Sequence, residues 1–154
     1  MTNTYYTYDT PFGSIIIESD GGAIIGIKRE SNAKPSGKKE VSTLTDIAAG
    51  QLEEYFAGKR KRFDLPLNPQ GTDFQKSVWK ALLDIPYGKT RSYKEIAKAT
   101  GNPKACRAVG MANNKNPIWI VIPCHRVIGT DGTLTGYGGG LTMKQRLLDL
   151  EKGK

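Results

Sequence analysis

The sequence contains few of the residues that crosslink a chain or bind metal. It has two cysteines, Cys106 and Cys124, and a single histidine, His125, among 154 residues. Two cysteines are too few for a disulfide scaffold, and a structural zinc site usually takes four ligands, more than this set supplies. We therefore expect no metal, no cofactor and a cytoplasmic location, where thiols stay reduced.

Long hydrophobic runs and a leader segment are also missing. The longest strongly apolar run covers residues 118–123, whereas a membrane-spanning helix needs about 20 apolar residues. The first ten residues lack the basic region and apolar stretch that mark a secretory signal. There is also no basic amphipathic helix with exposed Trp and Phe, so the sequence gives no sign of a membrane partner.

Acidic residues are scarce in the second half of the chain. The sequence has 23 Lys and Arg against 15 Asp and Glu, a net charge of +8. Residues 1–70 hold nine basic and nine acidic side chains, so residues 71–154 hold 14 basic and 6 acidic ones and account for the whole surplus. We expect this half to bind a polyanion, with nucleic acid as the first candidate.

The beginning of the chain is predicted to form a small α/β domain. Three segments alternate in the manner of strands and are separated by turns that contain glycine, which predicts a β-meander: residues 5–8, 14–17 and 23–27. Apolar residues at helical spacing predict one helix over residues 44–56. The stretch 65–71, with two prolines and a glycine, is typical of a linker. We therefore place one domain at 1–68 and a second at 69–154.

The second domain is predicted to be mainly helical. Two capping boxes, Thr72 with Gln75 and Ser92 with Glu95, predict the starts of two helices. A third helix follows a tight turn that contains glycine, and two short helices joined in this way form a helix-turn-helix. Its position makes residues 104–115 the candidate recognition helix.

The candidate recognition helix has small side chains where a reader of the major groove would carry Gln, Asn or Arg. These small residues permit a close approach to a partner but also suit helix packing: Ala105, Cys106, Ala108 and Gly110. Arg107 stands among them and can enter a base stack or a narrow minor groove, with a solvated surface position as the alternative. We also predict DNA contacts for Lys104, Lys115 and Arg126.

Reactive side chains concentrate at Cys124 and His125. The apolar run 118–123 is predicted to be a strand that buries Cys124 at its end. A neighbouring imidazole favours the thiolate, which is the nucleophilic form of cysteine. Adjacent residues on a strand point to opposite faces, so the two side chains can cooperate only if the chain turns or a water bridges them. These two residues alone leave an inert buried cysteine as an equal alternative.

The residues on both sides of the Cys-His pair form a longer motif. Residues 123–127, Pro-Cys-His-Arg-Val, are the hallmark of the O6-alkylguanine-DNA alkyltransferases, or methylated-DNA-protein-cysteine methyltransferases, and the chain closely resembles that family. Other motifs fall in the family's order and spacing: residues 74–75 with 78–79, 85–88, 92–93, 96–97, 107–110, 116–117 and 137–141. The first half is similar at residues 11–13 and 55–56, where the motifs are less specific.

The resemblance implies a fold and an activity. The fold is a ribonuclease-H-like α/β domain followed by a winged-helix-like domain with a helix-turn-helix. The activity is DNA repair, in which the alkyl group of O6-alkylguanine or O4-alkylthymine is transferred irreversibly to Cys124, so that each molecule acts once. The partner is double-stranded DNA, bound through the minor groove with the damaged nucleotide flipped out. We expect a monomer in solution, and cooperative binding on DNA is left open.

The resemblance also assigns roles around the cysteine. His125 would take the thiol proton through a water, and Glu151 would hold the imidazole. Local sequence alone does not choose Glu151 over Asp149. Asn116 would bond the backbone near Cys124, and Tyr93 would support the displaced nucleotide and protonate guanine N3.

The base pocket is implied by the same resemblance. Tyr137 would line it, while the Val127 carbonyl and the amides near Gly138 and Gly139 would read the base edge. Arg107 would fill the gap left in the stack. Trp119 stands where relatives often have a smaller residue, so it would narrow the pocket or belong to the core.

Two other functions compete with the alkyltransferase. A non-catalytic protein that binds alkylated guanine would lack the acceptor cysteine, and Cys124 is present. A winged-helix transcription regulator would carry base-reading polar residues on its recognition helix and would have no use for the Cys-His pair. Cys106 is expected to be a small packing residue and not a second acceptor.

Overall fold

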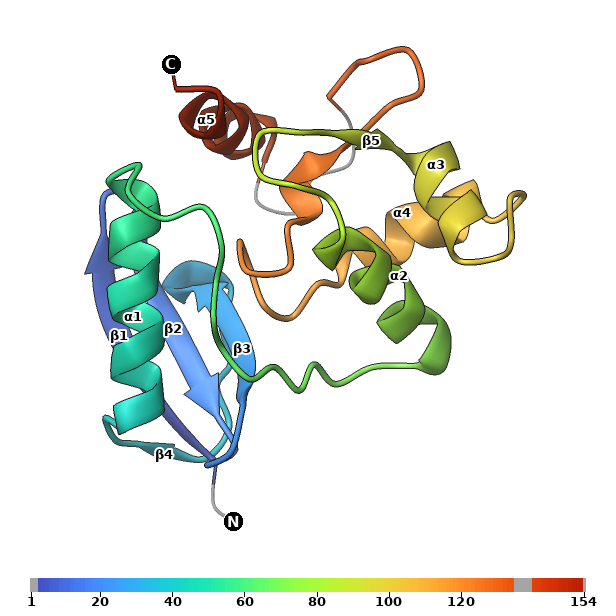
Figure 1. Ribbon diagram of the computed structural model, residues 1–154. Helices are drawn as coiled ribbons and strands as arrows, with labels where there is room; N and C mark the ends of the chain where they lie inside the picture. Colours follow the sequence, from blue (N-terminus) through green and yellow to red (C-terminus); the bar gives the residue numbers. More distant parts are fainter. Residues whose placement is uncertain (1–2, 135–139, 154) are drawn as a thin grey trace. The chain divides into compact units, whose positions relative to one another are not determined.

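The computed structural model describes residues 3–134 and 140–153, which form two compact units (Figure 1). The first unit contains Met1–Gln70 and Pro117–Trp119, and the second contains Gly71–Asn116 and Ile120–Lys154. The sequence predicts a boundary after residue 68 and assigns residues 117–119 to the second domain. The structure instead groups these three residues with the first unit.

Four strands form the sheet of the first unit, in the order β3-β2-β1-β4. Three of them make the predicted antiparallel meander, with each strand longer than expected: β1 (Thr4–Thr10), β2 (Gly13–Ser19) and β3 (Ile24–Arg29). The chain after β3 contains the 3₁₀ helix η1 (Glu30–Asn32) and the short strand β4 (Lys38–Lys39), which pairs parallel with β1. The meander is therefore confirmed.

Helix α1 (Thr43–Phe56) packs on β1 and β2 and lies across the sheet in Figure 1. A capping box opens the helix, because the Ser42 side chain accepts from the Thr45 amide and Thr45 accepts from the Ser42 amide. Its inner face is buried through Ala48, Leu52 and Tyr55. Ile47 fits the apolar spacing of the sequence but is 47% exposed, since it lies outside this face.

The free edge of β3 is extended by two segments distant in sequence. The Ile24 amide donates to the Pro66 carbonyl at 2.8 Å, in the stretch predicted as a linker. The Ile27 amide donates to the Pro117 carbonyl, and the Trp119 amide donates to the Ile27 carbonyl, both at 2.9 Å. These backbone bonds explain why residues 117–119 belong to the first unit.

The second unit is built mainly from helices. They are α2 (Asp73–Leu83), α3 (Tyr93–Ala99), α4 (Cys106–Asn114) and α5 (Leu141–Glu151). The short strands β5 (Arg91–Ser92) and β6 (Val127–Ile128) pair in parallel, and the 3₁₀ turn η2 (Cys124–Arg126) precedes β6. Both predicted capping boxes are present, at the starts of α2 and α3. No helix among the described residues is long and apolar enough to cross a membrane.

The candidate recognition helix corresponds to α4, which follows α3 as the helix-turn-helix prediction requires. It packs against both α2 and α3. The Trp79 indole on α2 donates a hydrogen bond of 2.9 Å to the Ala112 carbonyl on α4, and Trp79 is 2% exposed. This bond fixes the position of α4 through a group that is shielded from water.

Replacing Trp79 with Phe removes this bond, and the Ala112 carbonyl keeps only the Lys115 amide as a donor among the described residues, at 3.1 Å. One hydrogen bond contributes about 0.5–1.5 kcal/mol, and the smaller ring adds a packing loss. We expect a loss of at least about 1 kcal/mol in urea unfolding followed by circular dichroism. The control Leu83→Ala, at a residue on the same helix that is 45% exposed, should change stability by less than about 0.5 kcal/mol. Equal effects of the two substitutions would contradict the assignment.

Candidate functional site

The chain turns where the sequence predicts a strand. Residues 118–123 do not form a continuous strand, because Ile120 has a left-handed backbone with φ of 72°, and Cys124–Arg126 form the 3₁₀ turn η2. The strand prediction is wrong, since a short apolar run does not by itself distinguish a strand from a buried irregular segment. The turn meets the condition under which Cys124 and His125 can cooperate. We call residues 124–126 the acceptor turn.

A buried carboxylate joins three segments around the acceptor turn. Glu151 Oε2, at the end of α5, lies 2.6 Å from His125 Nε2 and 3.0 Å from Arg126 Nη2. Glu151 Oε1 accepts from Arg126 Nε at 2.8 Å and from the Gly88 amide at 3.2 Å. The Arg126 guanidinium also donates to the Ile85 carbonyl at 2.7 Å. These bonds connect the loop after α2, the acceptor turn and α5.

The network sets the charge states of its members. Burial disfavours the Glu151 anion, but the hydrogen bonds from His125 and Arg126 and the positive charge of Arg126 outweigh this effect and hold the pKa of Glu151 well below its ordinary value. Burial lowers the pKa of His125, with Glu151 acting in the opposite direction, so the imidazole is neutral near pH 7. Since Glu151 accepts at Nε2, the lone pair of the neutral ring lies on Nδ1.

The second ring nitrogen of His125, Nδ1, has no hydrogen-bond partner inside the described part of the protein. His125 is 0% exposed, and the adjacent Cys124 is 5% exposed. The turn therefore presents a buried thiol beside a buried imidazole whose basic nitrogen is free to accept a proton.

The prediction that Arg126 contacts DNA is wrong. Arg126 is 6% exposed, and all three of its guanidinium nitrogens donate to groups inside the protein. Its Cζ also lies 5.7 Å from the centre of the Tyr87 ring. The buried carboxylate needs a permanent cation as partner, and a planar guanidinium meets both of its oxygens.

Two asparagines hold the backbone around Cys124. Asn116 Nδ2 donates to the Ile122 carbonyl at 2.7 Å, a backbone bond of the kind predicted for it. Asn113, on α4, is 1% exposed and donates from Nδ2 to the Cys124 carbonyl at 3.3 Å. The sequence analysis missed Asn113, whose three-residue offset from Asn116 was the available signal.

Lys144 is a second buried group that the sequence analysis missed. It is 0% exposed, its ammonium donates to the Val127 carbonyl, and Nζ lies 5.9 Å from the centre of the Tyr93 ring. Burial lowers its pKa to about 8, while negative charge on Cys124 raises it. By the same interaction, the Lys144 cation favours the thiolate of Cys124. The Val127 carbonyl, predicted to read a base edge, is thus fixed in place.

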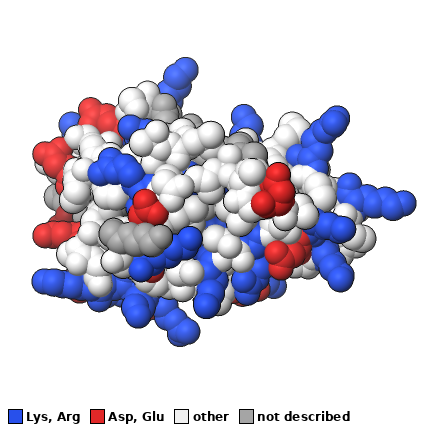
Figure 2. Space-filling model, turned by 90° about the horizontal axis from the view of Figure 1, so that it is seen from above, with Lys and Arg blue, Asp and Glu red and all other residues white. Residues whose placement is uncertain are grey.

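The residues of helix α4 and its ends that are predicted to contact DNA differ in their exposure to solvent. Arg107 and Ala108 are exposed, as are Lys104 and Lys115 at the two ends of the segment, while the small residues Ala105, Cys106 and Gly110 are partly exposed. A Cβ on Gly110 would lie 3.8 Å from the Tyr93 ring, an ordinary contact distance. Figure 2 shows basic side chains projecting from many points of one face, with acidic ones among them.

Several predicted pocket residues are not placed at this site. Tyr137, Gly138 and Gly139 lie outside the described residues. Trp119 is 8% exposed, belongs to the first unit and bonds β3 through its amide. Its place in a base pocket therefore stays a prediction.

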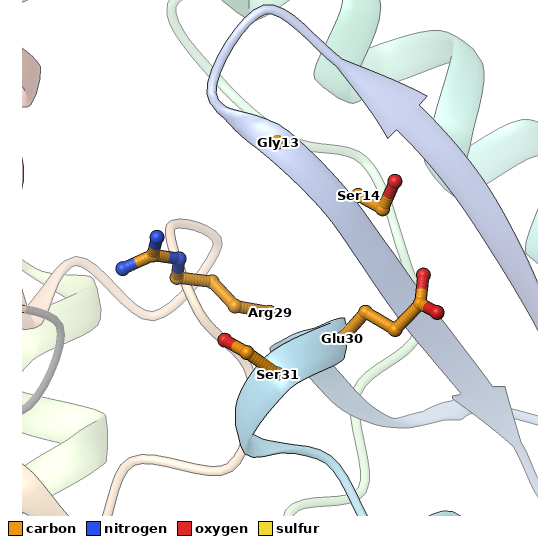
Figure 3. A pocket seen from close by; sticks show the side chains of 5 residues that line it. All are labelled: Gly13, Ser14, Arg29, Glu30 and Ser31. Carbon is orange, nitrogen blue, oxygen red and sulfur yellow. The ribbon is translucent and has the colours of Figure 1, made fainter.

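An open hollow of about 520 Å³ in the first unit carries no comparable chemistry (Figure 3). It is lined by Gly13, Ser14, Arg29, Glu30 and Ser31. The Arg29 and Glu30 side chains point in opposite directions in Figure 3, and Ser14 donates to Asp9 at 2.7 Å. In the described part of the chain, no three His, Cys, Asp or Glu residues group closely enough to hold a metal ion.

Comparisons with known proteins match both halves of the chain. The family model for the DNA-binding domain of 6-O-methylguanine DNA methyltransferase matches residues 73–153, and the model for its ribonuclease-like domain matches residues 3–69. A methylated-DNA–protein-cysteine methyltransferase of Methanosarcina barkeri is 56% identical over 150 residues, covering 89% of this chain and 95% of that protein.

Solved structures agree with the fold. The Mycobacterium tuberculosis OGT protein in complex with DNA has a TM-score of 0.92 and 48% identity, covering 97% of this chain and 93% of that one. A second structure, of the O6-methylguanine methyltransferase of the same organism, has a TM-score of 0.89 and 46% identity, covering 98% and 93%. The expected fold class, a sheet domain followed by a mainly helical domain, is confirmed.

Replacing Arg126 with Met tests the buried network. Glu151 would lose its guanidinium partner and keep only the neutral His125 ring and the Gly88 amide among the donors described here, and breaking a buried ion pair costs about 3 kcal/mol or more of unfolding free energy. The matched control is Arg60→Met, which breaks an exposed ion pair with Glu54 and should cost less than about 1 kcal/mol.

The stability difference between wild type and Arg126→Met should depend on pH. The depressed pKa of Glu151 contributes stability that is fully present above the ordinary value of 4.5 and is lost as the pH falls below it. The difference between wild type and Arg126→Met should therefore be largest near pH 7 and shrink below about pH 4.5. A difference that is constant with pH, measured by urea unfolding, would contradict the charge assignment.

Proposed function

The chain belongs to the 6-O-methylguanine DNA methyltransferase family, and from this premise we propose that it repairs DNA by moving the alkyl group of O6-alkylguanine to its own Cys124. The thiolate attacks the alkyl carbon, a C–S bond forms as the C–O bond breaks, and the electron pair leaves on guanine. The thioether is not reversed, so each molecule acts once. O4-alkylthymine is a second substrate of the same chemistry.

His125 prepares the thiolate. The Cys124 proton passes through a water to His125 Nδ1, and Glu151 stabilises the imidazolium that forms at its other nitrogen. The observation that carries the proposal is the buried pairing of His125 Nε2 with Glu151 at 2.6 Å directly beside a buried cysteine. Lys144 adds a cation that favours the thiolate.

Guanine leaves with a proton supplied at N3 by Tyr93. Tyr93 begins α3, and its ring faces the Lys144 ammonium and lies near Gly110 of α4. Asn116 holds the backbone before Cys124, and the Val127 carbonyl, together with Tyr137, Gly138, Gly139 and Trp119, forms the base pocket. These roles are the ones that the resemblance to the family implies.

DNA binds to the exposed side of α4. The small residues allow the helix to lie in the minor groove, while Lys104 and Lys115 meet phosphates. Arg107 takes the place of the nucleotide that is flipped out, because the alkyl group cannot be reached inside the duplex. The surplus of 8 positive charges in the second half supports this partner. Because the substrate is DNA, the protein acts inside the cell.

The direct test is the mass of the protein after reaction. Incubation with a duplex that contains O6-methylguanine should add one methyl group per molecule, and peptide mass spectrometry should locate it on Cys124. The other cysteine, Cys106, is the internal control and should stay unmodified. A methyl group on Cys106, or a protein that binds the duplex without gaining mass, would refute the proposal, and the second result would favour the non-catalytic alternative.

Replacing Cys124 with Ser should abolish transfer while retaining binding to the damaged duplex. A hydroxyl near neutral pH supplies almost no anionic nucleophile, whereas the side-chain volume changes little. Binding is measured by fluorescence anisotropy with a labelled duplex, and transfer by protein mass. If Cys124→Ser still gained a methyl group at the wild-type rate, another residue would be the acceptor.

Replacing Arg107 with Ala should slow repair of a duplex at least about tenfold, because unstacking the nucleotide costs a few kcal/mol that the arginine offsets. Reaction with the free O6-methylguanine base needs no flipping and should be unchanged. Arg62→Ala, at an exposed arginine of the first unit, is the matched control and should leave both rates unchanged. Equal losses on the duplex and the free base would contradict the flipping role.

A further inference from the structure

A large apolar side chain lies exposed in the middle of α4 and has no part in the mechanism above. Met111 is 64% exposed, whereas the other large apolar side chains exposed in the described part of the chain range from 38% to 49%. A single exposed apolar residue is common on protein surfaces, so its meaning depends on what surrounds it.

Met111 belongs to the exposed side of α4. Exposed positions recur at three- and four-residue spacing, which places them along one side of a helix. Arg107 precedes Met111 by four residues and the C-cap residue Lys115 follows it by four, so each lies about 6 Å from it along the helix axis. The exposed residues are Arg107, Ala108, Met111, Asn114 and Lys115, and the buried ones are Val109, Ala112 and Asn113.

Charge favours a nucleic acid as the partner of this side. Arg107 and Lys115 are both exposed, and the sequence has no Asp or Glu between residues 96 and 130. An apolar side chain between two cations complements the minor groove of DNA, in which phosphates line both rims and deoxyribose carbons form the walls. The small side chain of Ala108 lets the helix approach those walls closely.

Resting on the proposed function, we infer that Met111 packs against the deoxyribose walls of the minor groove, one helical turn from Arg107, and adds an apolar contact to the affinity for duplex DNA. Methionine is unbranched and flexible, so it adapts to a groove only about 6 Å wide. The contact removes apolar surface from water and releases no counterion. It therefore adds affinity that does not fall with salt, unlike the phosphate contact of Lys115.

The first test measures duplex affinity against salt concentration. An undamaged labelled duplex avoids reaction at Cys124, and fluorescence anisotropy gives the dissociation constant. Met111→Ala should weaken binding about tenfold at every salt concentration, because it removes an apolar contact without changing charge. Met111→Leu keeps the apolar volume and should stay within about twofold of wild type. By contrast, Lys115→Ala should reduce the slope of log K against log salt by about one.

The matched control is Ile47→Ala, at an apolar residue of α1 that is 47% exposed, and it should leave duplex affinity unchanged. Carbon-13 NMR of methionine methyl groups then tests the contact itself. The signal of Met111, assigned by its loss in Met111→Ala, should gain nuclear Overhauser effects to deoxyribose protons when the duplex is added. Met143 is 7% exposed and should gain none.

The outcomes separate this inference from the proposed function. Unchanged binding by Met111→Ala overturns the inference, as does the absence of contacts between the Met111 methyl group and DNA. Tighter binding by Met111→Ala also overturns it, because the side chain would then obstruct the groove. If wild type neither binds the duplex nor gains a methyl group from a damaged one, the proposed function fails instead.

Discussion

The ion pair between Glu151 and Arg126 is the interaction on which the reactive half of the chain depends. A carboxylate that is 7% exposed is unfavourable unless its oxygens are paired, and here both oxygens are occupied by Arg126, His125 and the Gly88 amide. Because the carboxylate and its donors come from three separate segments, satisfying one buried charge also fixes the loop after α2, the acceptor turn and α5. The same bonds set the imidazole ring in the orientation that leaves Nδ1 basic.

The acceptor turn is held from its other side by α4. Asn113 bonds the Cys124 carbonyl, and the Trp79 indole anchors α4 through the carbonyl of the preceding residue, Ala112. A helix whose exposed side carries Arg107 thus has a buried side that contacts the backbone of Cys124. In the proposed function, DNA recognition and alkyl transfer use opposite faces of one short helix, so that no long-range rearrangement is needed to connect them.

Much of the fold could be predicted from local sequence. The capping boxes before α2 and α3 and the alternation of the first three strands are short-range signals that hold in the structure. Residues 118–123 were not predictable, because their conformation depends on pairing with β3, a contact distant in sequence. Local sequence did not distinguish Glu151 from Asp149 as the partner of His125, and only the spacing of motifs in the family did. Arg126 was wrongly predicted to contact DNA, and Lys144 was not predicted at all, because a charged side chain is usually exposed. Their burial depends on partners that only the folded chain brings together.

Burial keeps His125 neutral, and Glu151 holds its Nε2 so that Nδ1 is the basic nitrogen beside the acceptor cysteine. Nitrogen-15 NMR of the full chain tests this directly, and the signal is unambiguous because the sequence has one histidine. We expect a neutral ring at pH 7, protonated at Nε2, with a pKa below the ordinary 6.5. An imidazolium at pH 7, or a neutral ring with its proton on Nδ1, would contradict it.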